Sequence, residues 1–331
     1  MKIAPSSHKA QQTMHMLSKL QSDFMEKLQS ISKQFGSPTQ FKTLEWLRDG
    51  GLHGGGLRFE AVEGSVFNRA SINISQVQYE DLPDKSFSSA TALSTIIHPC
   101  HPLAPSIHIH ISWTELKNGQ GYWRIMADLN PSIADQKDKE KFDQCLKEIT
   151  GKYHQQGVRL GDAYFYIPAL QSFRGVSHFY LEAFNPDNIT DNHFAKHFGE
   201  SVIKCYSEIL AQKLLNAEPP TAAQKTAQLN YHTLYFYQVL TLDKGTTAGL
   251  LIHNQNDTGT LGSLPARINR ALLASWVDIT PAPQDKLIKR FLSLLPEQDI
   301  CLISTPLKAQ IAEQIRTHYK EFPIKKSSER V

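Results

Sequence analysis

The sequence has little of several features that would mark particular classes of protein. It contains only four cysteines in 331 residues, Cys100, Cys145, Cys205 and Cys301, and they are far apart with no CxxC pair. That spacing argues against both a zinc site and a disulfide framework. No stretch of about 18 apolar residues occurs, so no membrane span is expected. The first residues lack an apolar secretory core, and together these absences predict a reduced, cytoplasmic protein.

Charge and glycine spacing exclude two further classes. The formal net charge is only +3, and no run of five or more like charges occurs, so a nucleic-acid partner is not expected. The glycine-rich segment 50–56 lacks the spacing of a phosphate-binding loop. We therefore expect a flexible or substrate-approaching loop there. Apolar residues at 40% and charged residues at 20% are typical of a soluble globular protein.

Hydrophobic periodicity predicts both helices and strands. Apolar residues recur at steps of three and four over residues 10–35, which indicates an amphipathic helix. Further helices are expected at 134–156, 191–215 and 283–295. Strands are expected at 57–62, 66–67, 72–79, the end of 87–102, 231–242 and 248–253, with a short element at 44–48, a turn at 243–246 and a surface loop at 217–226.

The clearest local signal is a hairpin. Residues 107–114 alternate strictly between apolar and polar side chains, Asn118-Gly119 marks a turn, and 122–129 forms the returning strand. Asn-Gly favours such turns because both residues tolerate positive φ. A two-residue turn would pair Asp128 with Ile109, whereas a three-residue loop would pair it with His110. We prefer the second register, which also brings Arg124 to the face of Asp128.

The first hairpin strand carries histidines on one face. His108, His110 and Ser112 alternate with Ile107, Ile109, Ile111 and Trp113, so the isoleucines mark the core side. The imidazoles could form a solvated polar face, take part in acid–base chemistry or substrate contact, or supply two zinc ligands that need a third from elsewhere. The sequence of the strand alone leaves these alternatives open.

Hairpins outnumber any βαβ pattern along the chain. This favours an α+β fold in which a large antiparallel β-sheet is flanked on both faces by α-helices. We predict an N-terminal helical segment at 1–40, a main domain at 41–285 and a C-terminal helical extension at 286–331, together forming a single compact unit.

Residues 64–131 carry motifs that resemble those of oxygen-dependent coproporphyrinogen III oxidases. The family pattern VFEKAGVNxSxV is matched by residues 66–77, and GVSxVxHPxNPxxPTxHxNxR is matched without gaps from Ala92 to Ser112. The GGGxDLTP pattern is matched by 125–131, and weaker echoes of later motifs occur at 174–180 and 243–250. These echoes keep the family order from about residue 44 to 280, and the last forty or so residues are not covered.

The resemblance implies a homodimer that decarboxylates two propionates of coproporphyrinogen III to vinyl groups. Dioxygen is the co-substrate, and no metal or organic cofactor is needed. The family's key aspartate matches Asp128, which would pair with or deprotonate pyrrole N–H groups, and its active-site histidine matches His108. The positions expected to bind the substrate are Ser94, His98, His110, Ser112, Arg124, Arg174 and Gly175.

Several positions depart from the family pattern. The family arginine four residues after the histidine is Ser112, and the glycines before the aspartate are Ile125-Met126-Ala127. Loss of a charge-assisted bond of roughly 1.5–3 kcal/mol would weaken binding of a carboxylate by about one to two powers of ten. We hypothesise that Arg124 partly compensates, since it would share a face with Ser112.

Two other functions compete with an active oxidase. One is a catalytically impaired paralogue that binds a tetrapyrrole or acts by protein association, which loss of arginines and glycines would favour. The other is an enzyme with a less acidic substrate on the same scaffold. Retention of His108 and Asp128 favours chemistry.

Overall fold

The computed structural model describes residues 2–185, 192–215, 217–252 and 254–323. The chain divides into two compact units, Met1–Tyr166 with Ser172–Gln228, and Ile167–Gln171 with Leu229–Val331. The division predicted at residues 40 and 285 is a different one and stays a prediction. Each unit is described by itself.

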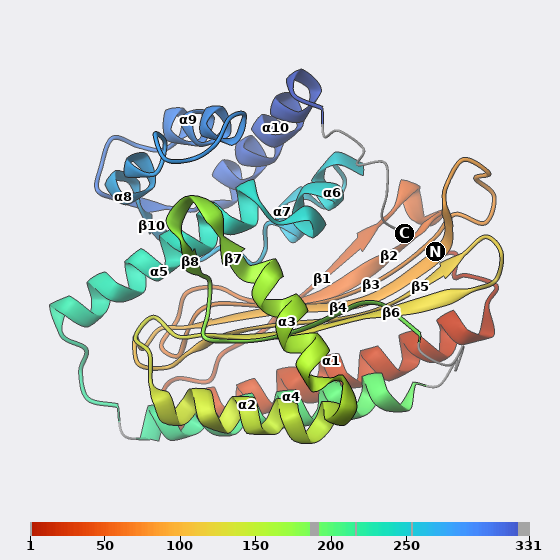
Figure 1. The fold of residues 1–331 in the computed structure, drawn as a ribbon, viewed down its shortest axis with the longest axis horizontal. Coiled ribbons are helices and arrows are strands. Elements are labelled where there is room, and N and C mark those ends of the chain that lie inside the picture. The colour runs from red at the N-terminus through yellow and green to blue at the C-terminus, as the bar shows by residue number, and fades with distance from the viewer. Residues whose placement is uncertain (1, 186–191, 216, 253, 324–331) are drawn as a thin grey trace. The chain divides into compact units, whose positions relative to one another are not determined.

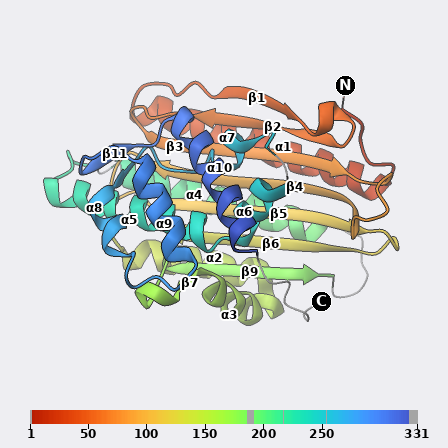
Figure 2. The ribbon, with the colours of Figure 1, turned by 90° about the horizontal axis from the view of Figure 1, so that it is seen from above.

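A seven-stranded antiparallel sheet forms the centre of the first unit (Figures 1 and 2). Its strand order is β1-β2-β3-β4-β5-β6-β9, so neighbours in sequence are neighbours in the sheet until β9 adds at the edge. This confirms the α+β fold with a large antiparallel sheet. The strands are β1 (Lys42–Leu47), β2 (Gly54–Ala61), β3 (Phe67–Gln78), β4 (Phe87–Pro99), β5 (Ser106–Leu116), β6 (Gly121–Asn130) and β9 (Ser177–Phe184).

Helices α1, α2 and α4 form a layer beneath this sheet in Figure 1. The helices of the unit are α1 (His8–Phe35), α2 (Gln136–Thr150), α3 (His154–Phe165) and α4 (His193–Leu215), with short 3-10 turns η1 (Asp49–Gly51) and η2 (Gly151–Tyr153) and the short strand β8 (Ser172–Phe173). The predicted helices are thereby confirmed, although 134–156 is divided by η2 and residue 191 lies outside the described residues. The glycine-rich segment expected as a loop instead divides between η1 and the start of β2.

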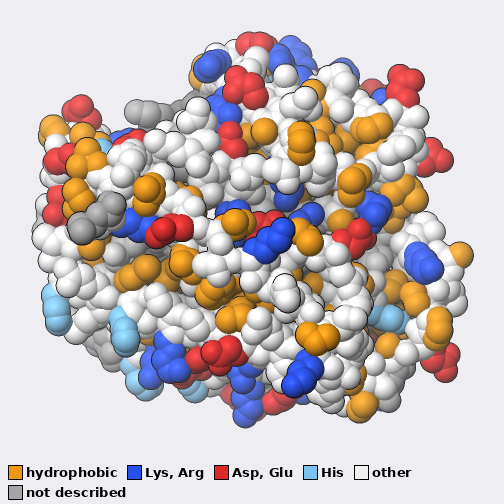
Figure 3. Space-filling view, turned by 180° about the vertical axis from the view of Figure 1, so that it is seen from behind, with side chains coloured by type: hydrophobic (Ala, Val, Ile, Leu, Met, Phe, Trp, Pro, Cys, Tyr) orange, Lys and Arg blue, Asp and Glu red, His pale blue; other side chains and the backbone are white. Residues whose placement is uncertain are grey.

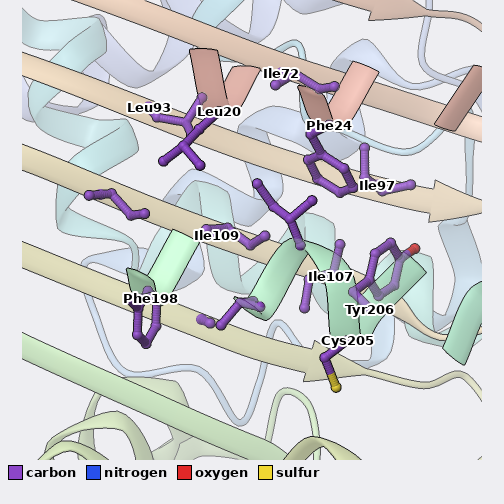
Figure 4. Close-up of a cluster of buried hydrophobic side chains, with 14 of the residues drawn as sticks. Leu20, Phe24, Ile72, Leu93, Ile97, Ile107, Ile109, Phe198, Cys205 and Tyr206 are labelled. Atoms are coloured by element: carbon purple, nitrogen blue, oxygen red, sulfur yellow. The ribbon is translucent and has the colours of Figure 1, made fainter. Parts of the chain in front are cut away.

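The core lies between the sheet and this helical layer. Figure 4 shows Leu20 and Phe24 of α1 and Phe198 of α4 packed against isoleucines of the sheet. Helix α1 begins after Ser7, whose hydroxyl accepts a hydrogen bond from the backbone N–H of Ala10 (3.2 Å). A buried amide also fixes this helix, because Gln21 Nε2 donates to the carbonyl of Ile72 (2.7 Å).

The predicted hairpin is present, but its register differs from the preferred one. Asp128 pairs with His108 and not with His110, because the loop between the strands is 117–119 and not 118–120: the backbone N–H of Leu116 donates to the carbonyl of Gln120 (2.7 Å). The error is two residues, and the side-chain period of a strand is also two. Asp128 therefore lies on the histidine face, as expected. Its partner, His108, is two residues further from the turn than the expected partner, His110.

The strands predicted at 231–242 and 248–253 are wrong, since these residues form helices. They lie in α5 (Ala222–Thr241) and α6 (Lys244–Ile252), while residue 253 lies outside the described part. Nearly every residue from 231 to 241 is buried. A helix buried on all sides has no polar face, so its aromatic and apolar run resembles a buried strand. The loop predicted at 217–226 is also shorter, because α5 begins at Ala222.

The second unit is mostly helical. The unit boundary falls within α5, and the remaining elements are η3 (Pro168–Leu170), α6, α7 (Asp257–Thr260), β10 (Arg267–Asn269), α8 (Arg270–Ser275), α9 (Gln284–Leu294), β11 (Ile300–Leu302) and α10 (Thr305–Glu321), while β7 (Tyr166–Ile167) lies at the other boundary. Strands β10 and β11 pair antiparallel.

Among the helices of the described ranges, none has the length and apolar character needed to cross a membrane. The face shown in Figure 3 carries basic and acidic side chains side by side.

A buried histidine in α5 makes the stability of the protein depend on pH. Burial lowers the pKa of His232 from 6.5 to about 3. A histidine whose folded pKa is depressed stabilises the fold above its unfolded pKa, and this contribution is lost as the pH falls. We expect the free energy of unfolding to fall by about 3 kcal/mol through this group between about pH 7 and pH 4.

Chemical denaturation at both pH values checks this. The His232→Leu variant should lose that share of the pH dependence, while His15→Leu, on the exposed side of α1, should keep it. Equal pH dependence in His232→Leu and the parent protein would contradict the assignment.

Candidate active site

The upper face of the sheet, opposite α1 and α4, carries a set of polar side chains. Strand alternation and the observed register place them together, because cross-strand partners share a face. They come from four adjacent strands and are Ser94 and His98 of β4, His108, His110 and Ser112 of β5, Arg124 and Asp128 of β6, and His178 of β9.

Asp128 is the most enclosed of these residues, with no exposed surface. Its Oδ2 accepts hydrogen bonds from Arg174 Nη2 (2.7 Å) and Asn130 Nδ2 (2.6 Å). Its Oδ1 lies 3.0 Å from His108 Nδ1. Both carboxylate oxygens are therefore occupied by groups of the protein itself.

The surroundings of Asp128 keep its carboxyl ionised. Burial raises the pKa of this group, but the nearby Arg174 guanidinium, His108 and their hydrogen bonds outweigh burial and bring the pKa down to about 2. A carboxylate that is charged, enclosed and paired with arginine is a poor proton acceptor near neutral pH.

His108 is oriented by this carboxylate. Its Nδ1 faces Asp128 Oδ1, and an ionised carboxylate can only accept, so the proton of the imidazole lies on Nδ1. In the neutral imidazole the other ring nitrogen, Nε2, would then carry the lone pair. The His108 side chain is 17% exposed, in contrast to Asp128. Of the two residues, His108 is thus the one whose side chain a ligand can contact.

Arg174 is held by its own surroundings. Its guanidinium carbon lies 4.6 Å from the centre of the Phe165 ring, and its backbone N–H donates to the carbonyl of Phe165 (3.0 Å). His178 Nε2 donates to the carbonyl of Arg174 (2.8 Å), and His178 Nδ1 lies 2.8 Å from Asp162 Oδ1. These contacts fix the arginine against Asp128.

Gly175 follows Arg174 in the sequence and packs against the end of β6. Its φ is +85°, a conformation that other residues rarely adopt. An added Cβ would lie 2.7 Å from Asn130 Oδ1 and 2.8 Å from the carbonyl oxygen of Leu129. The structure places Gly175 beside Asn130 and His178, in the lining of a pocket, and the expectation that it binds the substrate stays a prediction.

Arg124 lies directly opposite Ser112 in the sheet, as the compensation hypothesis requires. Its Nη2 donates to Glu182 Oε1 (2.5 Å), and its side chain is 36% exposed. A partly exposed ion pair of this kind contributes little and can rearrange. The guanidinium of Arg124 is therefore available near the position that the family arginine would occupy.

The other expected binding residues are arranged along β4 and β5. Ser94 pairs with His110, whose Nε2 lies 3.0 Å from the hydroxyl of Ser112. His98 has no exposed surface, and its Nδ1 lies 2.9 Å from Ser106 Oγ. Ser94, His110 and Ser112 thus form one group beside Arg124, whereas His98 is enclosed. Within the described ranges, no three His, Cys, Asp or Glu side chains are placed to hold a metal ion.

Two further arginines on this face were missed from the sequence. Strand pairing places Arg58 of β2 and Arg69 of β3 on the face of Ser94, and both are buried. Glu60 accepts from Arg58 Nε (3.1 Å) and lies 3.5 Å from Arg69 Nη1. The carboxylate of Glu63 also acts on Arg69, so the arginines lie among acidic side chains of the protein itself. Only the register of β2 and β3 could have placed them there.

Met126 also lies on this face, next to Asp128 in alternation. It pairs with His110 and is buried in a small cluster with Phe165 and Tyr180. Ile125 instead faces the core. Of Ile125 and Met126, the two bulky residues that replace family glycines, only Met126 borders the site.

Removing the charge partner of Asp128 should cost much stability. We expect Arg174→Met to lower the free energy of unfolding by about 3–5 kcal/mol, because it leaves a buried carboxylate without its cation. Adding Asp128→Asn should recover part of that loss. Arg124→Met, whose partner is exposed, should cost about 1 kcal/mol or less. Urea denaturation of these three variants and of Asp128→Asn alone measures these values, and additive losses would show that the pair is not coupled.

The chain is similar to one family of known proteins over most of its length. The family model described as coproporphyrinogen III oxidase matches residues 12–277. A protein from Rickettsia akari (strain Hartford), named oxygen-dependent coproporphyrinogen-III oxidase, is 31% identical over 247 residues, covering 70% of this chain and 85% of its own. A protein of the same name from Rickettsia bellii (strain OSU 85-389) is 30% identical over 251 residues, covering 71% and 86%. On the match over residues 12–277, together with these relatives, the chain belongs to the coproporphyrinogen III oxidase family.

Proposed function

We propose that the protein is an oxygen-dependent oxidase that converts coproporphyrinogen III to protoporphyrinogen IX. Each of two propionate side chains would lose carbon dioxide and become a vinyl group. The two electrons released at each side chain would pass to dioxygen, which serves as co-substrate. The observation that carries the proposal is the contact between His108 and Asp128 on a sheet face that also bears arginines.

His108 is the proposed proton carrier. Its Nε2 is the acceptor end of an imidazole whose other nitrogen is fixed by a carboxylate, and part of the ring is exposed. Proton removal from a pyrrole N–H or a propionate carbon is the step that a base of this kind assists.

We propose a different role for Asp128 from the one expected from the sequence. A carboxylate with no exposed surface and both oxygens engaged is poorly placed to meet pyrrole N–H groups. We propose that Asp128 is a positioning residue, which fixes the tautomer of His108 and stabilises its protonated form.

The substrate carboxylates would be bound by the cationic side of the same face. Arg124 lies opposite Ser112, and Arg58 and Arg69 add guanidinium groups on the same face toward β2. Guanidinium groups suit this role because they bind carboxylates with paired hydrogen bonds. We further propose that the protein acts as a cytoplasmic homodimer with neither metal nor organic cofactor, on the strength of its family alone.

An impaired paralogue that binds a tetrapyrrole without turnover is the second candidate. The feature that favours it is Met126, a bulky side chain on the site face where the family pattern has glycine. Close approach of a flat ligand to the backbone is harder over a side chain than over glycine.

Replacing the proposed proton carrier separates these candidates. We expect His108→Gln to lower kcat by about 10²–10⁴-fold, with a smaller change in KM, because acid–base catalysis contributes this much. Aerobic incubation with coproporphyrinogen III, followed by measurement of protoporphyrin after oxidation, gives both constants. His154→Gln, on α3, is the matched control and should keep the parent activity.

An active parent protein whose rate survives His108→Gln would refute the role of His108. Absence of product from the parent protein, with tight binding of coproporphyrin, would instead select the impaired paralogue. Absence of both product and binding would leave the third function, a different substrate.

The second test addresses the compensation by Arg124. We expect Arg124→Ala to weaken binding of the tetrapyrrole by about 10–100-fold, because one charge-assisted contact with a carboxylate is lost. Fluorescence titration with coproporphyrin measures the Kd. Arg159→Ala, exposed on α3, should leave it unchanged. Unchanged affinity in Arg124→Ala would remove the compensation hypothesis.

A further inference from the structure

Two cysteines of the first unit meet between helices α2 and α4. The Sγ atom of Cys145 lies 3.7 Å from the carbonyl oxygen of Ser201, which is one helical turn before Cys205. The Sγ atom of Cys205 lies 3.9 Å from the carbonyl oxygen of Lys141, one turn before Cys145. Each sulfur therefore lies over the turn that precedes the other cysteine, so the two thiols lie at the same point of the contact between α2 and α4.

The two thiols differ in exposure and acidity. Cys145 is half-buried, whereas Cys205 is only 6% exposed. The hydrogen bond between them lowers the pKa of the Cys145 thiol and raises that of Cys205, and burial raises the latter further. In Figure 4 the sulfur of Cys205 points away from Ile107 of the core. Cys145 is thus the more accessible member of the pair, the one that a dissolved disulfide meets first.

We propose that Cys145 and Cys205 form a reversible dithiol site, which a low-molecular-weight disulfide such as oxidised glutathione converts to a disulfide joining α2 to α4. This site lies outside the residues proposed for catalysis and does not depend on the proposed function.

The exchange proceeds in two balanced steps. The Cys145 thiolate attacks one sulfur of oxidised glutathione, a bond forms between them, and one glutathione thiolate leaves and takes up a proton. Cys205 then loses its proton and attacks the Cys145 sulfur, which releases the second glutathione. Two protein thiols are oxidised to one disulfide, and one oxidised glutathione is reduced to two thiols. Because the Cys205 and Cys145 sulfurs lie at the same point between the two helices, the mixed disulfide should be short-lived.

Peptide mapping of the native full-length protein tests the proposal. After incubation with oxidised glutathione, alkylation of remaining thiols and digestion with trypsin, we expect peptides 142–147 and 205–213, each with one cysteine, to be linked to each other. Dithiothreitol should separate them. The melting temperature of the oxidised protein should be about 5–10 °C higher, because the cross-link restricts the unfolded chain.

Single substitutions give the matched controls. Cys205→Ser should trap one glutathione on Cys145, since no resolving thiol remains, whereas Cys100→Ser should form the link as the parent protein does. The parent peptide map decides the proposal even if a variant fails to fold. A parent protein that keeps glutathione on Cys145, joins either cysteine to Cys100 or Cys301, or leaves both peptides unlinked would overturn it.

Discussion

The ion pair between Asp128 and Arg174 is the interaction on which the candidate site depends. A carboxylate with no exposed surface is tolerated because a guanidinium lies 2.7 Å away and two further groups contact its oxygens. The same pairing leaves one oxygen to orient His108. The stability of the fold and the orientation of His108 therefore both depend on the buried carboxylate of Asp128. Any change that loosens Arg174 would also disorder the imidazole.

Much of the site could be predicted from the hairpin because a strand repeats every two residues. The preferred register was wrong by two residues, yet the face of Asp128, His108 and Arg124 was right. By contrast, α5 was mistaken for a strand, because residues 231–241 are buried on nearly all sides and show no helical stripe. Periodicity informs on structure only where one side of an element meets a different environment.

Contacts between distant segments could not be read from the sequence. Arg174 was expected to bind the substrate, and only the packing of Phe165 and His178 places it against Asp128. Cys145 and Cys205 are 60 positions apart, so their spacing argued against pairing, and the antiparallel approach of α2 and α4 brings them together. These relations arise from tertiary packing, which local patterns do not encode.

Two residues at the site, Gly175 and Met126, differ in how well they tolerate substitution. Gly175 accepts no other side chain without displacing backbone, so saturation mutagenesis there should return only inactive clones. Met126 is flexible and packs only in a small aromatic cluster, which makes it replaceable by smaller residues. A library intended to admit bulkier macrocycles would therefore vary residue 126 and leave residue 175 untouched.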